Sequence, residues 1–364
     1  MDYEEILDGQ LESIDMSGLE DMMKSASEES GVFPSMTADE MVSSLLQGRP
    51  VLDSDSILEN LLNLFLAEIN SAVFLGCEIL AVCVVTGLLT NFSGAFGRRT
   101  VSSLGAVICG CIITALCIGS FFRTYSYCQD SMDTMTSVME ILLPVMIPLL
   151  IAMGGISSGG MMNPVIISAV TGFNFIMQHV VLPMVFLSAV FVLINSITER
   201  DYIKKLALLL RRVALFITGL SVTVFSGITA IQGVVTKSAD NILVNSAKFS
   251  LDNFVPIVGG FAADSLDMVI SCAGLIKNAA GLMGIITILS LLAIPVLKIL
   301  SVALIYKLTA VAAEPVSSKN ISDSLSEIGA AAVTMTVVLA MGALMFLIFI
   351  TVIMGMGGGG LWTS

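Results

Sequence analysis

Few side chains in this sequence have both the type and the surroundings that catalysis requires. The one histidine, His179, lies in an apolar stretch with no carboxylate near it, so we expect a turn residue at a membrane edge rather than a general base. The sequence holds no P-loop, no G-x-S-x-G and no H-E-x-x-H motif. We therefore predict that the protein is not an enzyme, has no catalytic residues and binds no cofactor.

The seven cysteines also lack the spacing of a metal site. Six of them lie inside apolar runs, no C-x-x-C occurs, and no histidine lies beside any of them. Cysteines in such positions usually behave as small buried hydrophobic residues. We predict no bound metal.

Two ionisable residues lie inside apolar runs, where an unpaired charge in lipid costs several kcal/mol. Glu78 falls about a third of the way into the first run, and Lys298 follows Pro295 in a later one. A transporter would use such groups for ions or protons. Polar contacts between helices or with a partner subunit explain them equally well.

Two prolines and a group of glycines form a second candidate site. Pro144 and Pro148 stand four residues apart in one run, where they free backbone carbonyls and kink a helix. The small residues that follow allow close approach of helices. This pattern fits either tight packing between helices or a broken helix that lines a passage. The candidate residues are Pro144, Pro148, Gly154, Gly155, Gly159, Gly160, Pro256, Gly259 and Gly260.

The composition shows which kind of fold must position these residues. The mean hydropathy is +0.96, and 56% of the residues are hydrophobic against 12% charged. A soluble domain needs about a quarter of its residues charged. The sequence therefore predicts an all-α polytopic membrane protein, with about seven to nine transmembrane helices and a short acidic helical region before them.

The acidity of the chain is confined to residues 1–68. These hold 16 acidic residues and two basic ones, whereas the rest of the chain holds 13 and 14. This acidity argues against nucleic acid or anionic lipid as a partner, and fits a solvated face, which is favoured, or a protein-binding surface. Leu7, Leu11 and Ile14 share one helix face, and the segments 37–40 and 56–59 fit capping boxes, so we expect short amphipathic helices.

The apolar runs predict the membrane spans. Runs of about 20 residues cover 71–90, 101–122, 138–156, 213–232, 284–306 and 329–354. The stretch 163–197 would make a helix about 52 Å long, beyond a hydrocarbon core of roughly 30 Å. We therefore expect a hairpin there that turns near Gln178 and His179.

Basic residues support this count. Arg98 and Arg99 mark one loop as cytoplasmic. A later basic loop is the candidate site for a cytoplasmic partner, with Arg200, Lys204, Lys205, Arg211 and Arg212. The hairpin places both loops on one side and both termini outside. Export of the acidic region then requires either a first span that inserts with its N-terminus outside or a leader removed from a longer chain.

We divide the chain into four parts. These are an acidic extramembrane region at 1–68, a first bundle of about six spans at 69–235, an uncertain segment at 236–283, and the last two spans with a glycine-rich tail at 284–364. The uncertain segment fits a span, a re-entrant piece or an interfacial helix. The last two are favoured, because a span would invert every later loop.

The same segments carry a resemblance to a known family. The stretches are 142–150, Asn163-Pro-Val-Ile, 181–188, 205–212, 247–260 and 298–308. In order, across residues 60 to 354, they resemble the stage III sporulation protein AE family of endospore-forming bacteria.

The resemblance implies a subunit of the channel complex that joins mother cell and forespore. It implies a place in the mother-cell membrane that surrounds the forespore, and a role in late forespore development. Its partners would be other subunits of the complex, a cytoplasmic ATPase, a forespore membrane protein and the lipid bilayer. No catalytic residues carry over. An independent secondary transporter and a structural anchor for the ATPase remain as alternatives.

Overall fold

The computed structural model describes residues 7, 9–11, 14–52, 54–96, 99–153, 168–197, 203–254 and 259–356, and every regular element in these ranges is helical. The predicted all-α polytopic class is confirmed. The helices are α2 (Ser17–Ser30), α3 (Ala38–Leu46), α4 (Ser54–Phe96), α5 (Arg99–Ala152), η1 (Met177–Val181), α7 (Leu182–Ile197), α8 (Lys204–Phe254), α9 (Gly259–Ala313) and α10 (Lys319–Met354).

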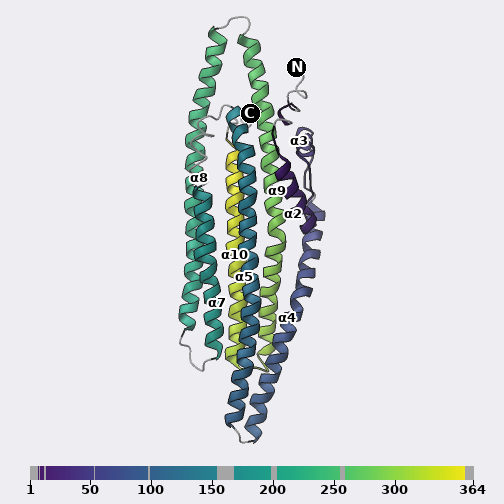
Figure 1. Ribbon diagram of the computed structural model, residues 1–364, viewed down its shortest axis with the longest axis vertical. Helices are drawn as coiled ribbons and strands as arrows, with labels where there is room; N and C mark the ends of the chain where they lie inside the picture. Colours follow the sequence, from purple (N-terminus) through teal and green to yellow (C-terminus); the bar gives the residue numbers. More distant parts are fainter. Residues whose placement is uncertain are drawn as a thin grey trace.

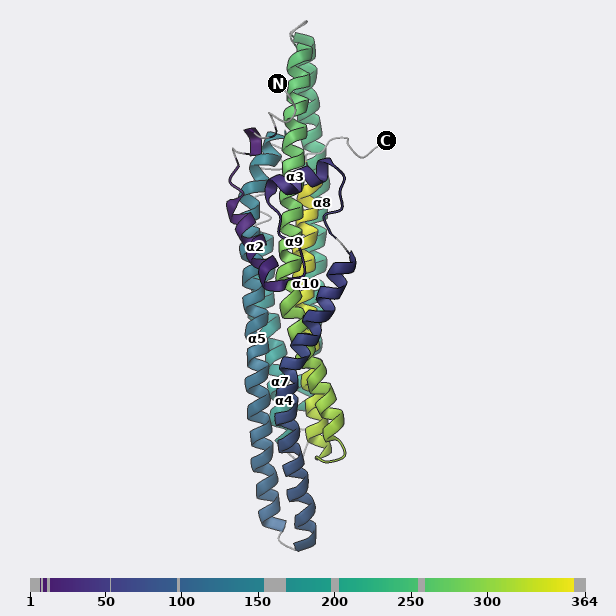
Figure 2. The ribbon, with the colours of Figure 1, turned by 90° about the vertical axis from the view of Figure 1, so that its right-hand side faces the viewer.

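Six helices in the described ranges are long and apolar enough to cross a membrane, against the seven to nine expected. They run side by side as one elongated bundle (Figures 1 and 2). α5 and α10 lie in the middle in Figure 1, with α7 and α8 on one side and α4, α9 and α2 on the other. α4 and α5 project beyond their neighbours at one end, and α8 and α9 project at the opposite end.

One reason for the lower count is α5. The sequence predicts two spans, at 101–122 and 138–156, joined by a polar loop, but α5 is a single helix of 54 residues, about 80 Å long. Residues 123–137 contain neither glycine nor proline, so nothing in this polar segment breaks the helix. The segment remains helical and places its polar side chains in the middle of the bundle.

The prediction of a hairpin within 163–197 is wrong over the residues that the structure describes. Residues 168–197 form one continuous helix, in which Met177–Val181 is a wider π-helical turn. Proline interrupts regular α-helical hydrogen bonding, and Pro183 lies two residues after the end of this turn. The polar residue Gln178 needs no turn at the surface, because its amide Nε2 donates to Asp133 Oδ1 at 2.5 Å.

Residues 236–283 belong to two long helices rather than to a separate short one. α8 continues to Phe254, and α9 begins at Gly259 and runs on through the apolar segment to Ala313. Lys277, which interrupts this segment in sequence, is 1% exposed and donates to the carbonyl oxygen of Met356 just after α10. A lysine at a helix C-terminus is favourable because the helix dipole is negative there.

The basic segments lie at the same end of the bundle, as predicted, although the number of helices between them differs from the prediction. The sequence predicts four crossings between the Arg99 end and the basic 204–212 segment, whereas the structure has two. Both numbers are even, so the starts of α5, α8 and α10 share one end of the bundle. This end carries Arg99, Lys204, Arg211 and Lys319, and is called the basic end below.

The acidic N-terminal region folds as short helices against the bundle rather than as a separate body. Leu19 and Met23 of α2 are fully buried, and the predicted capping box of Thr37 and Glu40 is present at the start of α3. The second predicted box is wrong, because α4 begins at Ser54 and Ser56 lies inside its first turn. α2 is short and amphipathic, so its stability depends on this packing.

Two glycines provide a test of the packing at the basic end. A Cβ at Gly87 of α4 would overlap the backbone carbonyl of Val316 between α9 and α10, whereas a Cβ at Gly110 of α5 would meet nothing within 4 Å. Gly87→Ala should lower the free energy of unfolding by about 1–3 kcal/mol because backbone must move. Gly110→Ala should leave it unchanged or raise it by up to ~1 kcal/mol, since alanine favours the helix. Thermal unfolding followed by circular dichroism in nanodiscs measures both; equal effects would contradict the packing described.

Candidate functional site

The middle of α5 carries three carboxylates on one face. Asp130, Asp133, Ser137 and Glu140 follow the spacing i, i+3, i+7, i+10, which keeps them on one side of an α-helix. The three acidic side chains are exposed on the surface of the bundle, and Ser137 is half-buried. Together these four residues are called the acidic face of α5.

Contacts with α10 show at which depth this face lies. Cys128 Sγ approaches the carbonyl oxygen of Met335 at 4.0 Å, and Met132 lies against Gly342. Two residues beyond Glu140, Leu142 contacts Gly284 of α9. α10 is the most apolar of the six candidate spans. The acidic face therefore lies at the level of the apolar middle of its neighbours.

Asp133 has one defined partner in this arrangement. The π-helical turn at Met177–Val181 widens the helix and directs the buried side chain of Gln178 toward α5, where it donates to Asp133. π-helical turns occur often at functional sites. His179 lies in the same turn but stacks on Phe175, with ring centroids 4.6 Å apart, on the outer surface. It is a helix residue rather than the expected turn residue.

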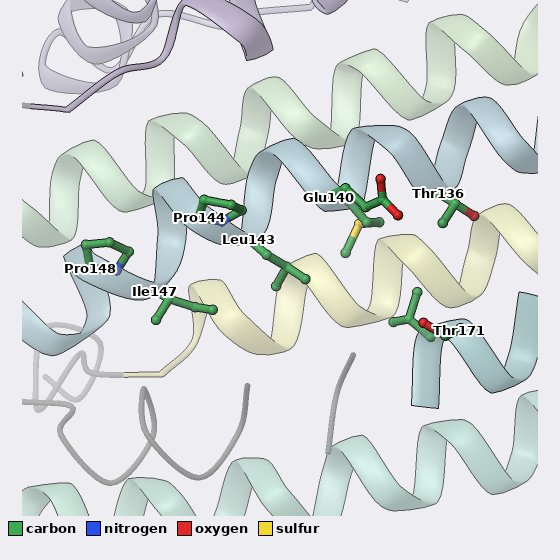
Figure 3. A pocket seen from close by; sticks show the side chains of 9 residues that line it. Thr136, Glu140, Leu143, Pro144, Ile147, Pro148 and Thr171 are labelled. Carbon is green, nitrogen blue, oxygen red and sulfur yellow. The ribbon is translucent and has the colours of Figure 1, made fainter. Parts of the chain in front are cut away.

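A cavity of about 430 Å³ lies beside the acidic face where the two prolines occur. Figure 3 shows Thr136, Glu140, Pro144 and Pro148 on α5, with Thr171 of the following helix across the cavity. Because proline lacks an N–H, Pro144 and Pro148 leave the carbonyls of Glu140 and Pro144 without their helical donors. This cavity thus combines a carboxylate with free backbone acceptors in an otherwise apolar setting.

A second cavity, of about 300 Å³, lies between α2, α5 and α9 and contains Lys298. The ammonium group of Lys298 sits 4.2 Å from the centre of the Tyr127 ring, a cation–π contact. Asp130 of α5 and Glu29 of α2 line the same cavity. Lys298, predicted as an intramembrane charge, therefore faces a polar cavity covered by the acidic region instead of lipid.

α2 extends the acidic surface beside α5. A Cβ at Gly18 would lie 3.4 Å from the side chain of Ile141, and Ala26 and Glu29 line the Lys298 cavity, so α2 runs along the same part of α5. Its outward side exposes Asp21, Glu28 and Glu29. The exposed carboxylates of α2 and the acidic face of α5 together are called the acidic flank.

The other side of the bundle is apolar. Large hydrophobic side chains exposed on α7 and α8 include Leu187, Ile194, Phe216, Leu220 and Val224. Phe225 of α8 contacts Phe349 of α10, with ring centroids 6.5 Å apart, so this surface lies at the same depth as the acidic face. At one level, the molecule presents hydrocarbon-like surface on one side and carboxylates on another.

The predicted partner loop divides into two classes of residue. Arg211 binds Glu327 of α10 with a 2.9 Å ion pair and also donates to the Glu327 carbonyl, and Lys204 lies 3.8 Å from Asp323. Lys205 and Arg212 are exposed. Arg200 lies outside the described residues. The structure thus makes Arg211 a contact between α8 and α10, and leaves Lys205 and Arg212 open to a partner.

The remaining predicted residues do not join these cavities. Glu78 is exposed on α4, and nearby Gly76 lies against Ile305 and Thr309, so Glu78 is level with the Lys307 end of α9. Gly259 and Gly260 are the first two residues of α9. Gly154, Gly155, Gly159, Gly160 and Pro256 lie outside the described residues.

The carboxylates of α5 were not among the residues predicted from the sequence. Asp130 and Asp133 fall in the segment predicted as a loop between two spans, where charged residues are ordinary. Their helical spacing with Glu140 was the available signal, but it indicates a site only if the helix is continuous. In chemical terms the carboxylates can bind cations, protons or basic side chains. The described residues contain no group of three or more metal-binding side chains, and the seven cysteines are free thiols.

The comparisons with known proteins agree on one family. The family model for stage III sporulation protein AE matches residues 36–357, which is most of the chain. The chain belongs to the stage III sporulation protein AE family. Stage III sporulation protein AE of Bacillus subtilis (strain 168) is 33% identical over 296 residues, covering 81% of this chain and 73% of that protein. No solved structure matches the chain. Membership of the family supports a role in sporulation, and the six apolar helices support a multi-pass membrane protein.

The Arg211–Glu327 contact provides a test at the basic end. Arg211→Ala leaves a partly buried carboxylate and a carbonyl of α10 without their donor, so it should lower the free energy of unfolding by about 1–2 kcal/mol. Arg212→Ala, one residue along the same helix, should change it by less than about 0.5 kcal/mol. Thermal unfolding of both variants in nanodiscs is the measurement, and indistinguishable values would refute the assigned contact.

Proposed function

We propose that this chain is a membrane subunit of the channel complex between mother cell and forespore, located in the mother-cell membrane around the forespore. It supports late forespore development by helping to form a passage rather than by catalysis. Three features support the proposal: the sporulation family, the six apolar helices, and the acidic flank at the depth of the apolar core. The acidic flank is the observation that carries it.

Contact with lipid would be energetically unfavourable for the acidic flank. An aspartate at the centre of a membrane helix costs about 2.5–3.5 kcal/mol on insertion scales, and α5 alone exposes three carboxylates. Charged groups at this depth face water or protein. Within one chain they would be expected inside the bundle, as in a secondary transporter, but here they lie on its outer surface. This favours a subunit that borders an aqueous space together with neighbours.

A second exposed surface also requires a neighbour. Gly87 packs on Val316 at the basic end, and around this level the α4–α5 hairpin exposes Val84, Val85, Leu88 and Ile108. Apolar surface of this kind outside the bundle usually marks a protein interface or contact with lipid. A complex with other subunits covers both surfaces, whereas an isolated chain leaves both exposed.

The two ends of the bundle suggest how partners are arranged. Lysine and arginine are enriched in cytoplasmic segments, so the basic end faces the mother-cell cytoplasm. The acidic region, at the other end of α4, then faces the space between the two membranes. A cytoplasmic ATPase would bind at the basic end through Lys205 and Arg212, and the forespore membrane partner would approach from the acidic side.

Deletion and complementation in the native spore former tests this function. Deletion should leave engulfment normal and abolish late forespore gene expression, because the channel complex acts after engulfment. Complementation with Asp130→Asn, Asp133→Asn and Glu140→Gln combined should fail at normal protein levels, since the passage loses its charge. The matched control combines Leu187→Ile, Leu220→Ile and Val224→Ile on the apolar side and should restore spores.

Two results would count against the proposal. Normal heat-resistant spores in the deletion strain would remove the sporulation role. Full rescue by the triple carboxylate variant would keep the sporulation role and remove the acidic flank from it.

A further inference from the structure

The Lys298 cavity holds more charge than it can balance with its own residues. Its lining includes two carboxylates, Glu29 and Asp130, and one ammonium group, Lys298, which leaves one negative charge in excess. The structure places no carboxylate oxygen within 4.0 Å of Lys298 Nζ among the described residues. Lys298 instead lies over the ring of Tyr127. The carboxylates are therefore not neutralised by direct ion pairing.

Other groups around the cavity also lack hydrogen-bond partners. Ser290 is 1% exposed, lines the cavity, and its Oγ has no partner within the described part of the chain. A buried hydroxyl without a partner costs about 1–3 kcal/mol, so such groups usually meet a ligand or water. Pro295 frees the carbonyl of Leu291, one turn earlier, and Leu291 lines the same cavity.

The hydroxyls of α5 add acceptors of the same kind. Ser131 Oγ donates to the Tyr127 carbonyl at 2.6 Å, and Thr134 Oγ1 donates to the Asp130 carbonyl at 2.8 Å. Each hydroxyl hydrogen is thus used within α5, and the oxygen lone pairs remain as acceptors. Both residues line the cavity. The cavity accordingly presents carboxylate, hydroxyl and carbonyl oxygens from two helices of the bundle and from α2.

We propose that this cavity binds a monovalent metal cation, sodium or potassium, between Glu29, Asp130 and Ser290. Hard cations are bound by oxygen ligands of these types. A single positive charge balances the excess negative charge, whereas a divalent ion would leave a positive excess beside Lys298. This site goes beyond the proposed function, because a cation here stabilises the chain whether or not it belongs to a channel complex.

The position of the site gives the cation a structural consequence. Glu29 comes from the acidic N-terminal region, Asp130 from α5 and Ser290 from α9. A bound cation therefore joins α2 to the bundle. Lys298 competes with it as a tethered positive charge, so removal of Lys298 should strengthen cation binding. A purely structural role for Lys298 does not predict this increase in cation affinity.

The test is thermal unfolding of the full chain in nanodiscs, in equal concentrations of sodium, potassium or N-methyl-D-glucamine chloride. Sodium or potassium should raise the unfolding temperature of the wild-type chain above that in N-methyl-D-glucamine. Asp130→Asn should weaken the apparent cation affinity about tenfold or more. Glu140→Gln, a carboxylate of the same helix in the other cavity, should leave it unchanged, and Lys298→Gln should increase it.

The salt dependence of the unfolding temperature distinguishes a monovalent cation site from its alternatives. No difference among the three salts, or a rise that survives unchanged in Asp130→Asn, would overturn it. A rise produced only by magnesium or calcium would overturn the assignment of a monovalent ion. Where Asp130→Asn does not fold, Ser290→Ala takes its place, because it removes one neutral ligand and should weaken the affinity without changing the charge.

Discussion

The cost of placing ionised carboxylates at the depth of hydrocarbon constrains how this molecule can sit in a membrane. The apolar middle of α10 is level with Asp130, Asp133 and Glu140 of α5, and the opposite side of the bundle at that level is hydrophobic. A bilayer centred instead on the apolar hairpin of α4 and α5 would immerse Arg211, Glu327 and Lys307. We therefore infer that the bilayer follows α7, α8 and α10, which requires water or protein beside the acidic flank.

The continuity of α5 makes this surface possible. A loop in the middle of α5 would place the carboxylates in solvent at the membrane surface, where they require no special neighbour. As one helix of 54 residues, α5 carries them into the bundle, and α2 packs beside them. Proline residues then add free carbonyls on either side, near Pro144 in one cavity and near Pro295 in the other. The continuous helix, its polar positions and the prolines thus together build two cavities that each contain charged side chains.

The sequence was sufficient for the fold class, for the amphipathic N-terminal helices and for the common side of the basic segments, because these depend on composition and short-range periodicity. It was insufficient for the span count. Hydropathy detects the polar residues 123–137 but does not distinguish a loop from the polar face of a long helix. It likewise suggested a turn at Gln178, because the partner that satisfies Gln178, Asp133, is 45 residues away along the chain. Lys298 was identified by its type, but its neighbour Glu29 comes from a region more than 260 residues earlier, which no local pattern reveals.

The central claim is that the acidic face of α5 meets water or protein at a depth where α8 meets lipid. Nitroxide labels on introduced ketone-bearing amino acids at Ser137 and Val224 test it directly, and leave the seven native cysteines untouched. In nanodiscs, collision with oxygen reports lipid exposure and collision with a water-soluble nickel chelate reports water. We predict that at position 137 either the nickel chelate relaxes the label more strongly than oxygen does, or neither reagent reaches it. At position 224 oxygen should relax the label more strongly than the chelate does. Oxygen-dominated relaxation at both positions would contradict it, because the carboxylate face would then lie in lipid.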